Sequence, residues 1–159
     1  MRASSSQELK QELSSLKPSE LVELSLRLAR FKKENKELLS YLLFEAHDEE
    51  EFIEGVKREI EELFGGINHS QLYFAKKTLR KIVRIINKYS RYSGIKQTDL
   101  EMRLFFCLKL KGSGIPFRQN PVISNLYNNQ VKKIEANLSS LHEDLQHDYS
   151  KQIAEIKLN

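Results

Sequence analysis

The sequence predicts an all-α protein of seven or eight helices, arranged as antiparallel hairpins in an irregular array or bundle. Apolar residues recur at steps of three and four along most of the chain, which is the spacing of one helical face. Three prolines and six glycines leave few breaks between these segments. No segment alternates apolar and polar residues as a half-buried strand does. Helices joined by short turns favour antiparallel neighbours.

The size of the chain predicts one domain that covers residues 1–159. A chain of 159 residues suffices for a single hydrophobic core. The composition, 40% hydrophobic and 30% charged, is typical of a folded chain and not of a disordered one. The first residues, "MRASSSQELK", offer no apolar run that could serve as a signal peptide, and no run of about eighteen apolar residues occurs in the sequence. We therefore expect a soluble cytoplasmic protein with no membrane partner.

The first three helices are predicted from leucine spacing and from residues that favour helix starts. Leucines predict a short and frayed helix within residues 1–16. Pro18 suits the first turn of the next helix, where its missing N–H is not needed. That helix carries the row Leu21, Leu24, Leu28 and Phe31. Asn35 is a candidate N-cap for a third helix that reaches Ala46.

Four further signals divide the middle of the chain. Asp48 followed by Glu51 forms a capping-box pattern at the start of a fourth helix. The glycine pair at 65 and 66 is expected to end that helix in a left-handed turn. Asn68 with Gln71 predicts the start of a fifth helix, which runs to Tyr92.

The last third holds the most apolar helix and one clear loop. Thr98 with Glu101 repeats the capping-box pattern ahead of a sixth helix, which we expect to be the most buried. A loop with two glycines and two prolines covers residues 112–122. Asn120 is placed to cap a seventh helix that begins at Pro121. The apolar row that follows fits one helix or two over residues 121–157, and Ser140 with Glu143 favours a break.

Two stretches resemble a known family. They are "LKQELSSLKPSELVELSLRLARFKKENKELLSYLLF" and "AKKTLRKIVRIINKYSRYSGIKQTDLEMRLFFC". In apolar spacing and in the interruption "RFKKENKE" they are similar to an uncharacterised family of small all-helical bacterial proteins, a domain of unknown function associated with the Bacteroidetes. The resemblance implies a bacterial cytoplasmic protein. It assigns no activity, so it transfers no functional residues.

Positive charge is concentrated in the middle of the chain. Residues 65–120 carry 12 Lys/Arg and 2 Asp/Glu, while residues 1–64 carry 10 and 15. At 100° per residue, six cations of the fifth helix and one tyrosine share an arc of about 100°. We call this set the basic face: Tyr73, Lys77, Arg80, Lys81, Arg84, Lys88 and Arg91. From Lys77 to Arg91 it extends for about 20 Å.

Three interpretations of the basic face stay open at this point. It can be an ordinary solvated surface, or it can be neutralised within the fold by Glu50, Glu54 and Glu61. It can bind an acidic protein partner, including the acidic front segment of another copy. It can bind the backbone of a nucleic acid. Like charges four residues apart cost the helix a few tenths of a kcal/mol each, so the pattern is more than a neutral surface.

We find no motif for catalysis, a metal or a cofactor. Cys107 lies in an apolar run and is predicted to be a core residue. His142 and His147 diverge by about 140° on a helix, which disfavours a shared metal ion. The sequence therefore favours a non-catalytic protein-interaction module or small scaffold, with a protein partner or self-association. A nucleic-acid backbone binder is the alternative, and an enzyme with dispersed residues is the third hypothesis.

Overall fold

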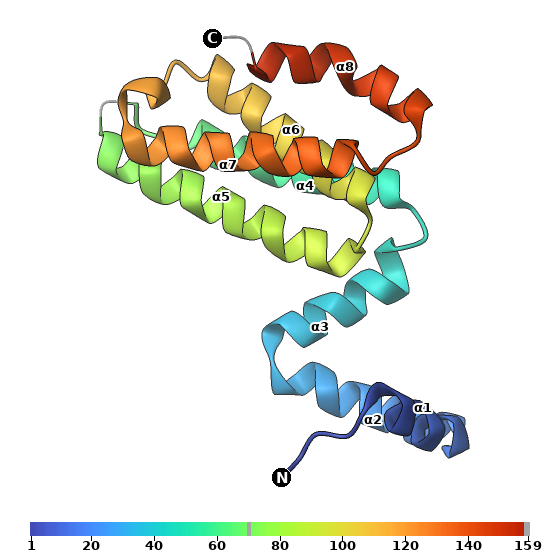
Figure 1. Ribbon diagram of the computed structural model, residues 1–159. Coiled ribbons are helices and arrows are strands. Elements are labelled where there is room, and N and C mark those ends of the chain that lie inside the picture. The colour runs from blue at the N-terminus through green and yellow to red at the C-terminus, as the bar shows by residue number, and fades with distance from the viewer. Residues whose placement is uncertain (70, 158–159) are drawn as a thin grey trace. The chain divides into compact units, whose positions relative to one another are not determined.

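The computed structural model describes residues 1–69 and 71–157 and confirms the all-α class (Figure 1). Eight α-helices and two short turns of π- and 3-10-helix make up the ordered elements, and the described ranges contain no strand. The predicted number of seven or eight helices is therefore confirmed.

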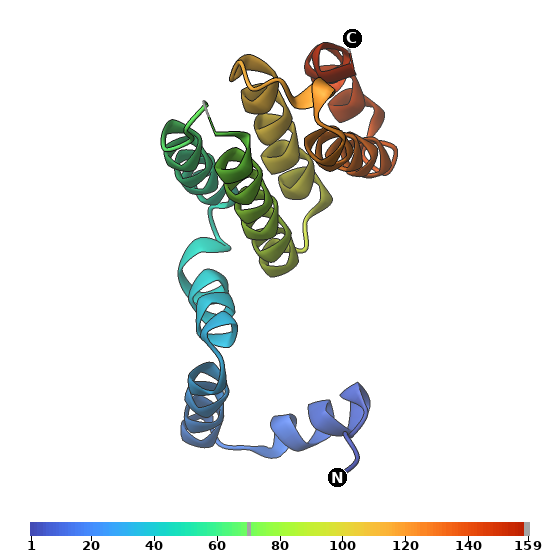
Figure 2. The ribbon, with the colours of Figure 1, turned by 90° about the vertical axis from the view of Figure 1, so that its left-hand side faces the viewer.

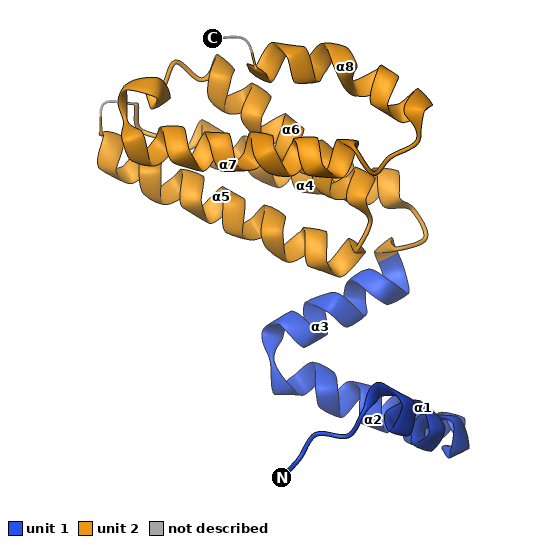
Figure 3. Cartoon of the chain, in the orientation of Figure 1, with its two compact units in different colours: residues 1–44 blue, residues 45–159 orange. Residues whose placement is uncertain are grey.

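The chain divides into two compact units, residues 1–44 and residues 45–159, whereas the sequence predicts a single domain (Figure 3). The first unit holds α1 (Ser6–Ser15), α2 (Pro18–Phe31) and α3 (Lys33–Ser40). A π-helical turn, Tyr41–Glu45, follows α3.

Residues 1–44 have almost no hydrophobic core of their own. Every side chain of α1 is exposed, and only Ala29 and Tyr41 are buried in this unit. The apolar residues of these helices follow the predicted spacing, but most of their side chains are exposed to solvent. Short helices of this kind are marginal in water without a surface to pack on.

Two predicted helix starts in this unit have different outcomes. Pro18 lies in the first turn of α2, as predicted, and the Glu20 carboxylate accepts from the Lys17 N–H at 2.7 Å. The prediction that Asn35 caps the third helix is wrong. Helix α3 begins at Lys33, and the Asn35 amide instead donates to the Leu28 carbonyl at 2.9 Å. It thereby ties α3 to the end of α2.

Residues 45–159 form a helical array around a central helix (Figure 2). Its elements are α4 (Glu49–Gly65), α5 (Leu72–Ser93), α6 (Lys96–Gly112), a 3-10 turn η2 (Phe117–Gln119), α7 (Pro121–Leu138) and α8 (Glu143–Lys157). Helix α6 packs against α4, α5, α7 and α8. Eight of its seventeen residues are buried, more than in any other described helix. The prediction that the sixth helix is the most buried is confirmed.

Helix α4 begins and ends at the predicted residues, but neither end has the full predicted geometry. The Asp48 carboxylate accepts from the Glu51 N–H at 3.1 Å. Glu51 does not reach back to complete the capping box, because its carboxylate binds Arg58 at 2.7 Å. Helix α4 ends at the glycine pair, but the left-handed turn predicted there is wrong: Gly66 has a φ of −86°.

The predicted starts of α5 and α6 are both misplaced. Helix α5 begins at Leu72, after Gln71, and not behind Asn68. Gly94 ends it in a left-handed conformation with a φ of 68°, and this tight turn lets α6 begin at Lys96. Thr98 is therefore not a cap. It is buried inside α6, where its hydroxyl donates to Glu49 of α4 at 2.6 Å.

The C-terminal helices follow the predicted break. Asn120 caps α7 by accepting from the N–H groups of Val122 and Ile123, at 3.1 and 3.3 Å. The loop predicted over residues 112–122 contains the turn η2. Helices α7 and α8 are separate, which confirms the break. Ser140 does not cap α8, because its hydroxyl donates back to the Asn137 carbonyl at 2.7 Å.

A buried arginine joins three helices of this unit. Arg103 of α6 is 3% exposed. Its guanidinium donates to Asn87 of α5 at 2.9 Å and to Gln130 of α7 at 2.5 Å. It also lies 2.7 Å from a carboxylate oxygen of Asp99, one turn earlier in α6. Buried charges are tolerated when they are paired in this way.

The Asp99 carboxyl has a lowered pKa. Burial alone raises it, but hydrogen bonds from Arg103, Ser90 and Asn137 and the charge of Arg103 together outweigh that effect. Because the pKa is lower in the folded state than in the unfolded state, ionised Asp99 stabilises the fold at neutral pH. That contribution is lost as the pH falls below about 4 towards the folded pKa.

We expect Asp99→Asn to lower the free energy of unfolding at pH 7 by about 3 kcal/mol, since it leaves the buried Arg103 charge without its counter-charge. Urea denaturation at several pH values measures this. The difference between the variant and the unmodified protein should shrink on acidification from pH 7 to about 3. A constant difference over that range would contradict the assigned role of Asp99.

Candidate anion-binding face

Helix α5 has the two opposed faces that its sequence predicts. Its apolar side is buried in the array through Ala75, Leu79, Ile82, Val83 and Ile86. The cations lie on the other side of the helix. The amphipathic character on which the candidate site depends is therefore present in the structure.

The members of the basic face are solvent-exposed, with one exception. The exposed side chains are Tyr73, Lys77, Arg80, Lys81, Arg84 and Arg91. Lys88 is half-buried, and its ammonium lies 4.9 Å from the centre of the Tyr89 ring. Arg84 folds back weakly, because its Nε lies 3.4 Å from the Arg80 carbonyl oxygen. Five of the six cations are thus exposed to solvent.

These exposed cations have no carboxylate partners. Over residues 1–69 and 71–157, no ion pair involves Lys77, Arg80, Lys81, Arg84 or Arg91. Three of the neighbouring helix's glutamates were candidates for neutralising them. Glu54 instead pairs with Lys57 at 2.7 Å within α4, and Glu61 pairs with Lys109 of α6.

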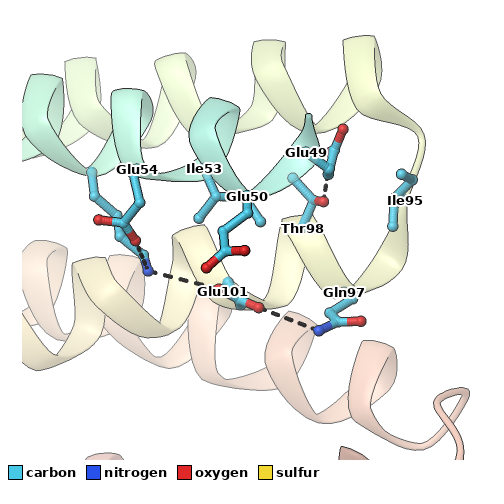
Figure 4. A pocket seen from close by; sticks show the side chains of 9 residues that line it. Glu49, Glu50, Ile53, Glu54, Ile95, Gln97, Thr98 and Glu101 are labelled. Carbon is cyan, nitrogen blue, oxygen red and sulfur yellow. Dashed lines mark hydrogen bonds and ion pairs between the residues drawn. The ribbon is translucent and has the colours of Figure 1, made fainter. Parts of the chain in front are cut away.

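Glu50 lies beside a groove between α4 and α6, as does Glu54 (Figure 4). The third glutamate, Glu61, reaches the same helix through its ion pair with Lys109. A fourth one, Glu59, accepts from the Tyr89 hydroxyl at 3.0 Å. Among the described residues, Glu54 and Glu61 thus pair with lysines outside the basic face, so neither forms an ion pair with Lys77, Arg80, Lys81, Arg84 or Arg91.

The two acidic residues between 65 and 120 are also engaged elsewhere. Asp99 belongs to the Arg103 network between α5, α6 and α7. Glu101 accepts from the Tyr149 hydroxyl of α8 at 2.6 Å and lies 3.7 Å from the Lys57 ammonium. Both carboxylates hold helices together, so neither offsets the charge of the basic face.

A lysine from α7 extends the positive surface. The Lys133 ammonium lies 3.4 Å from the Asn87 side-chain oxygen. Asn87 is on α5, one turn from Arg84 and one turn from Arg91, so Lys133 borders the basic face on its α7 side. Partial burial, followed by the charge of Arg103, lowers the pKa of Lys133. Sequence spacing does not reveal this residue, because α7 meets α5 only in the folded chain.

Two aromatic rings stand at the N-terminal end of the basic face. Tyr73 is 72% exposed and Phe74 is 52% exposed. Their ring centres are 5.4 Å apart in an edge-to-face arrangement. The basic face predicted from the sequence includes Tyr73 but not Phe74, which lies about 20° outside the arc occupied by the cations. The unusual exposure of Phe74 is the signal that only the structure provides.

The groove in Figure 4 is a poor alternative site. It has a volume of about 570 Å³ and lies between α4 and α6. Most of its polar groups already have partners: Glu49 accepts from Thr98, and the Gln97 amide donates to the Tyr149 hydroxyl of α8 at 2.9 Å. These hydrogen bonds link α4, α6 and α8, which is a structural role.

The remaining chemistry-bearing residues do not assemble. Among the residues described, no three His, Cys, Asp or Glu side chains lie together as metal ligands would. His142 pairs only with the exposed Asp144, at 3.3 Å. Cys107 is fully buried, which confirms its predicted place in the core. None of the described helices combines the length and apolar character needed to cross a bilayer.

Comparison with protein-family models, curated proteins and solved structures finds no match to the chain. The resemblance to an uncharacterised bacterial family therefore stays a prediction. Any functional conclusion must come from the chain's own surfaces.

We expect the Cys107 thiol to be inert in the folded protein. Burial raises its pKa to about 12, although the charge of Arg103 acts in the opposite direction. Only the thiolate is a nucleophile, so a disulfide reagent at pH 8 should label the thiol fully in denaturant and very slowly without it. Rapid labelling of the folded protein would contradict the burial of this side chain.

Proposed function

We propose that the chain is a non-catalytic binding module that holds an acidic macromolecular partner on the basic face. The observation that carries the proposal is the lack of ion-pair partners, within the described residues, for five exposed cations in one row. An array of like charges costs the helix stability. It also attracts polyanions over long distances and releases their bound counterions.

Three further features support a binding role over a catalytic one. The thiol is buried, most polar groups of the groove between α4 and α6 are paired, and the basic face is a surface and not a cavity. From the resemblance to an uncharacterised bacterial family, we further propose that the protein works in the cytoplasm of a bacterium. Neither part of the proposal needs a cofactor or a metal.

The double variant Arg80→Glu/Arg84→Glu tests the basic face. We expect the unmodified protein to bind at least one polyanion, poly-glutamate or oligothymidylate, and to bind it more weakly at about 200 mM than at about 50 mM salt. The variant should lose more than about tenfold in affinity, as two contacts become repulsive. Fluorescence anisotropy measures both effects.

The control is Lys96→Glu/Lys151→Glu, which changes the net charge equally at exposed positions outside the basic face. It should bind nearly as well as the unmodified protein. Thermal unfolding adds a second readout. The Arg80/Arg84 variant should be at least as stable as the unmodified protein, because residues 80 and 84 stay a like-charge pair while Lys77 and Lys88 each gain an opposite-charge neighbour. Equal losses of affinity in both variants, or a less stable Arg80/Arg84 variant, would count against the proposal.

Residues 1–44 favour a second candidate function, which is self-association. Ten large apolar side chains between Leu9 and Phe44 are exposed. Exposed apolar side chains in such number are typical of association sites in soluble proteins. A second copy offers the same rows for burial, so we assign the occupant of this surface to another copy of the chain.

We expect the protein to be a dimer or larger in solution, and Leu28→Glu/Phe31→Glu to shift it to the monomer mass. These two side chains are among the most exposed of the apolar row on α2, so a charge there is harmless unless the surface is covered. Light scattering after size exclusion measures the mass. The control is Arg27→Glu/Arg30→Glu, which changes exposed polar positions of the same helix. A monomeric unmodified protein would rule out self-association.

A further inference from the structure

The basic face consists almost entirely of cations along its length. From Lys77 to Arg91, every residue of which is described, no large apolar side chain is exposed. Specific protein interfaces instead bury aromatic and aliphatic side chains at their centre and keep charges at the rim. Such a surface suits a partner that brings repeated negative charge and few apolar groups along the contacted strip. A phosphate backbone has this composition.

The spacing of the cations also suits a linear chain of anions. Cationic side chains recur on each turn of α5, at intervals of about 5.4 Å along the axis. Lys133 widens the row on the α7 side, next to Asn87. Side chains on successive turns can therefore contact successive phosphates of one strand, while the flexible Lys and Arg stems adjust to its path.

The aromatic pair distinguishes between forms of nucleic acid. Tyr73 and Phe74 are exposed at the end of the same row, where the first cation, Lys77, lies one turn further along. Exposed aromatic rings beside a cationic track are the arrangement that single-strand binders use, because unpaired bases stack on the rings. The bases of a duplex are already stacked on each other and cannot use such a platform without being opened.

We propose that the basic face binds single-stranded nucleic acid, with Arg and Lys side chains on its phosphates and Tyr73 and Phe74 stacked on its bases. The proposal rests on the function proposed above for the same surface and names the partner. An acidic protein would use the cations but would leave the aromatic pair without a specific role.

Fluorescence anisotropy of the full chain with labelled oligothymidylate of about 16 nucleotides tests this inference. We expect Tyr73→Ala/Phe74→Ala to raise the Kd about tenfold, because each base–ring stack contributes to affinity. The same variant should leave the salt dependence of binding unchanged. Arg84→Ala should instead reduce the slope of log K against log salt by about 0.7, the value for one lost phosphate contact on a single strand.

Two matched variants serve as controls. Lys96→Ala removes an exposed cation outside the basic face, and Ile95→Ala truncates an exposed apolar side chain at the same turn. Both should bind as the unmodified protein does. Circular dichroism of all variants checks that α5 stays helical. We expect it to do so, because the substituted side chains are exposed and not part of the core.

The outcomes separate this inference from the proposed function. Equal affinity for the strand and for its duplex, or unchanged affinity in the aromatic variant, would overturn the stacking inference and leave the proposed function in place. Tighter binding of poly-glutamate than of oligothymidylate would do the same and identify an acidic protein as the partner. If the protein binds none of these polyanions at about 50 mM salt, both proposals fail.

Discussion

The pairing of the buried Arg103 guanidinium is the constraint on which the array of residues 45–159 depends. A charge at 3% exposure is tolerated only when its donors are satisfied. Here they are satisfied by Asn87 of α5, Asp99 of α6 and Gln130 of α7, which fixes three helices against one another. The same pairing engages Asp99, one of only two carboxylates between residues 65 and 120. Because Asp99 pairs with the buried Arg103, it is not available as a counter-charge for the exposed cations of α5.

The apolar periodicity of the sequence predicts the helices well but carries no information on the two compact units. Spacing identifies which side of a helix needs to be covered, and α5 and α6 are covered by the helices that precede and follow them. For α2 the same kind of row, from Leu21 to Phe31, is formed but stays largely exposed. A row of apolar residues indicates which side of a helix is to be buried, but it does not identify the surface that buries it.

Helix starts and the candidate site show a similar limit. Asp48 and Asn120 act as caps, whereas Asn35 and Thr98 have capping sequences but bind other groups, because tertiary contacts compete for the same side chains. The basic face was predictable, since its residues lie on one helix and follow one period. Lys133 was not, because it comes from α7, and Phe74 was not, because exposure is a property of the folded chain. Residues that come together from different helices cannot be predicted from spacing along the sequence alone.

The row of like charges on α5 makes ionic strength act in two opposite directions. Dissolved ions weaken the repulsion between Lys77, Arg80, Lys81 and Arg84, so a saltier medium favours the helix itself. The same ions compete with any polyanion for that surface. A bound polyanion would replace the small ions in reducing the repulsion, and occupancy of the surface would raise the resistance of α5 to melting. The helix is thus most rigid when it is either strongly screened or occupied, and least rigid when it is bare in dilute buffer.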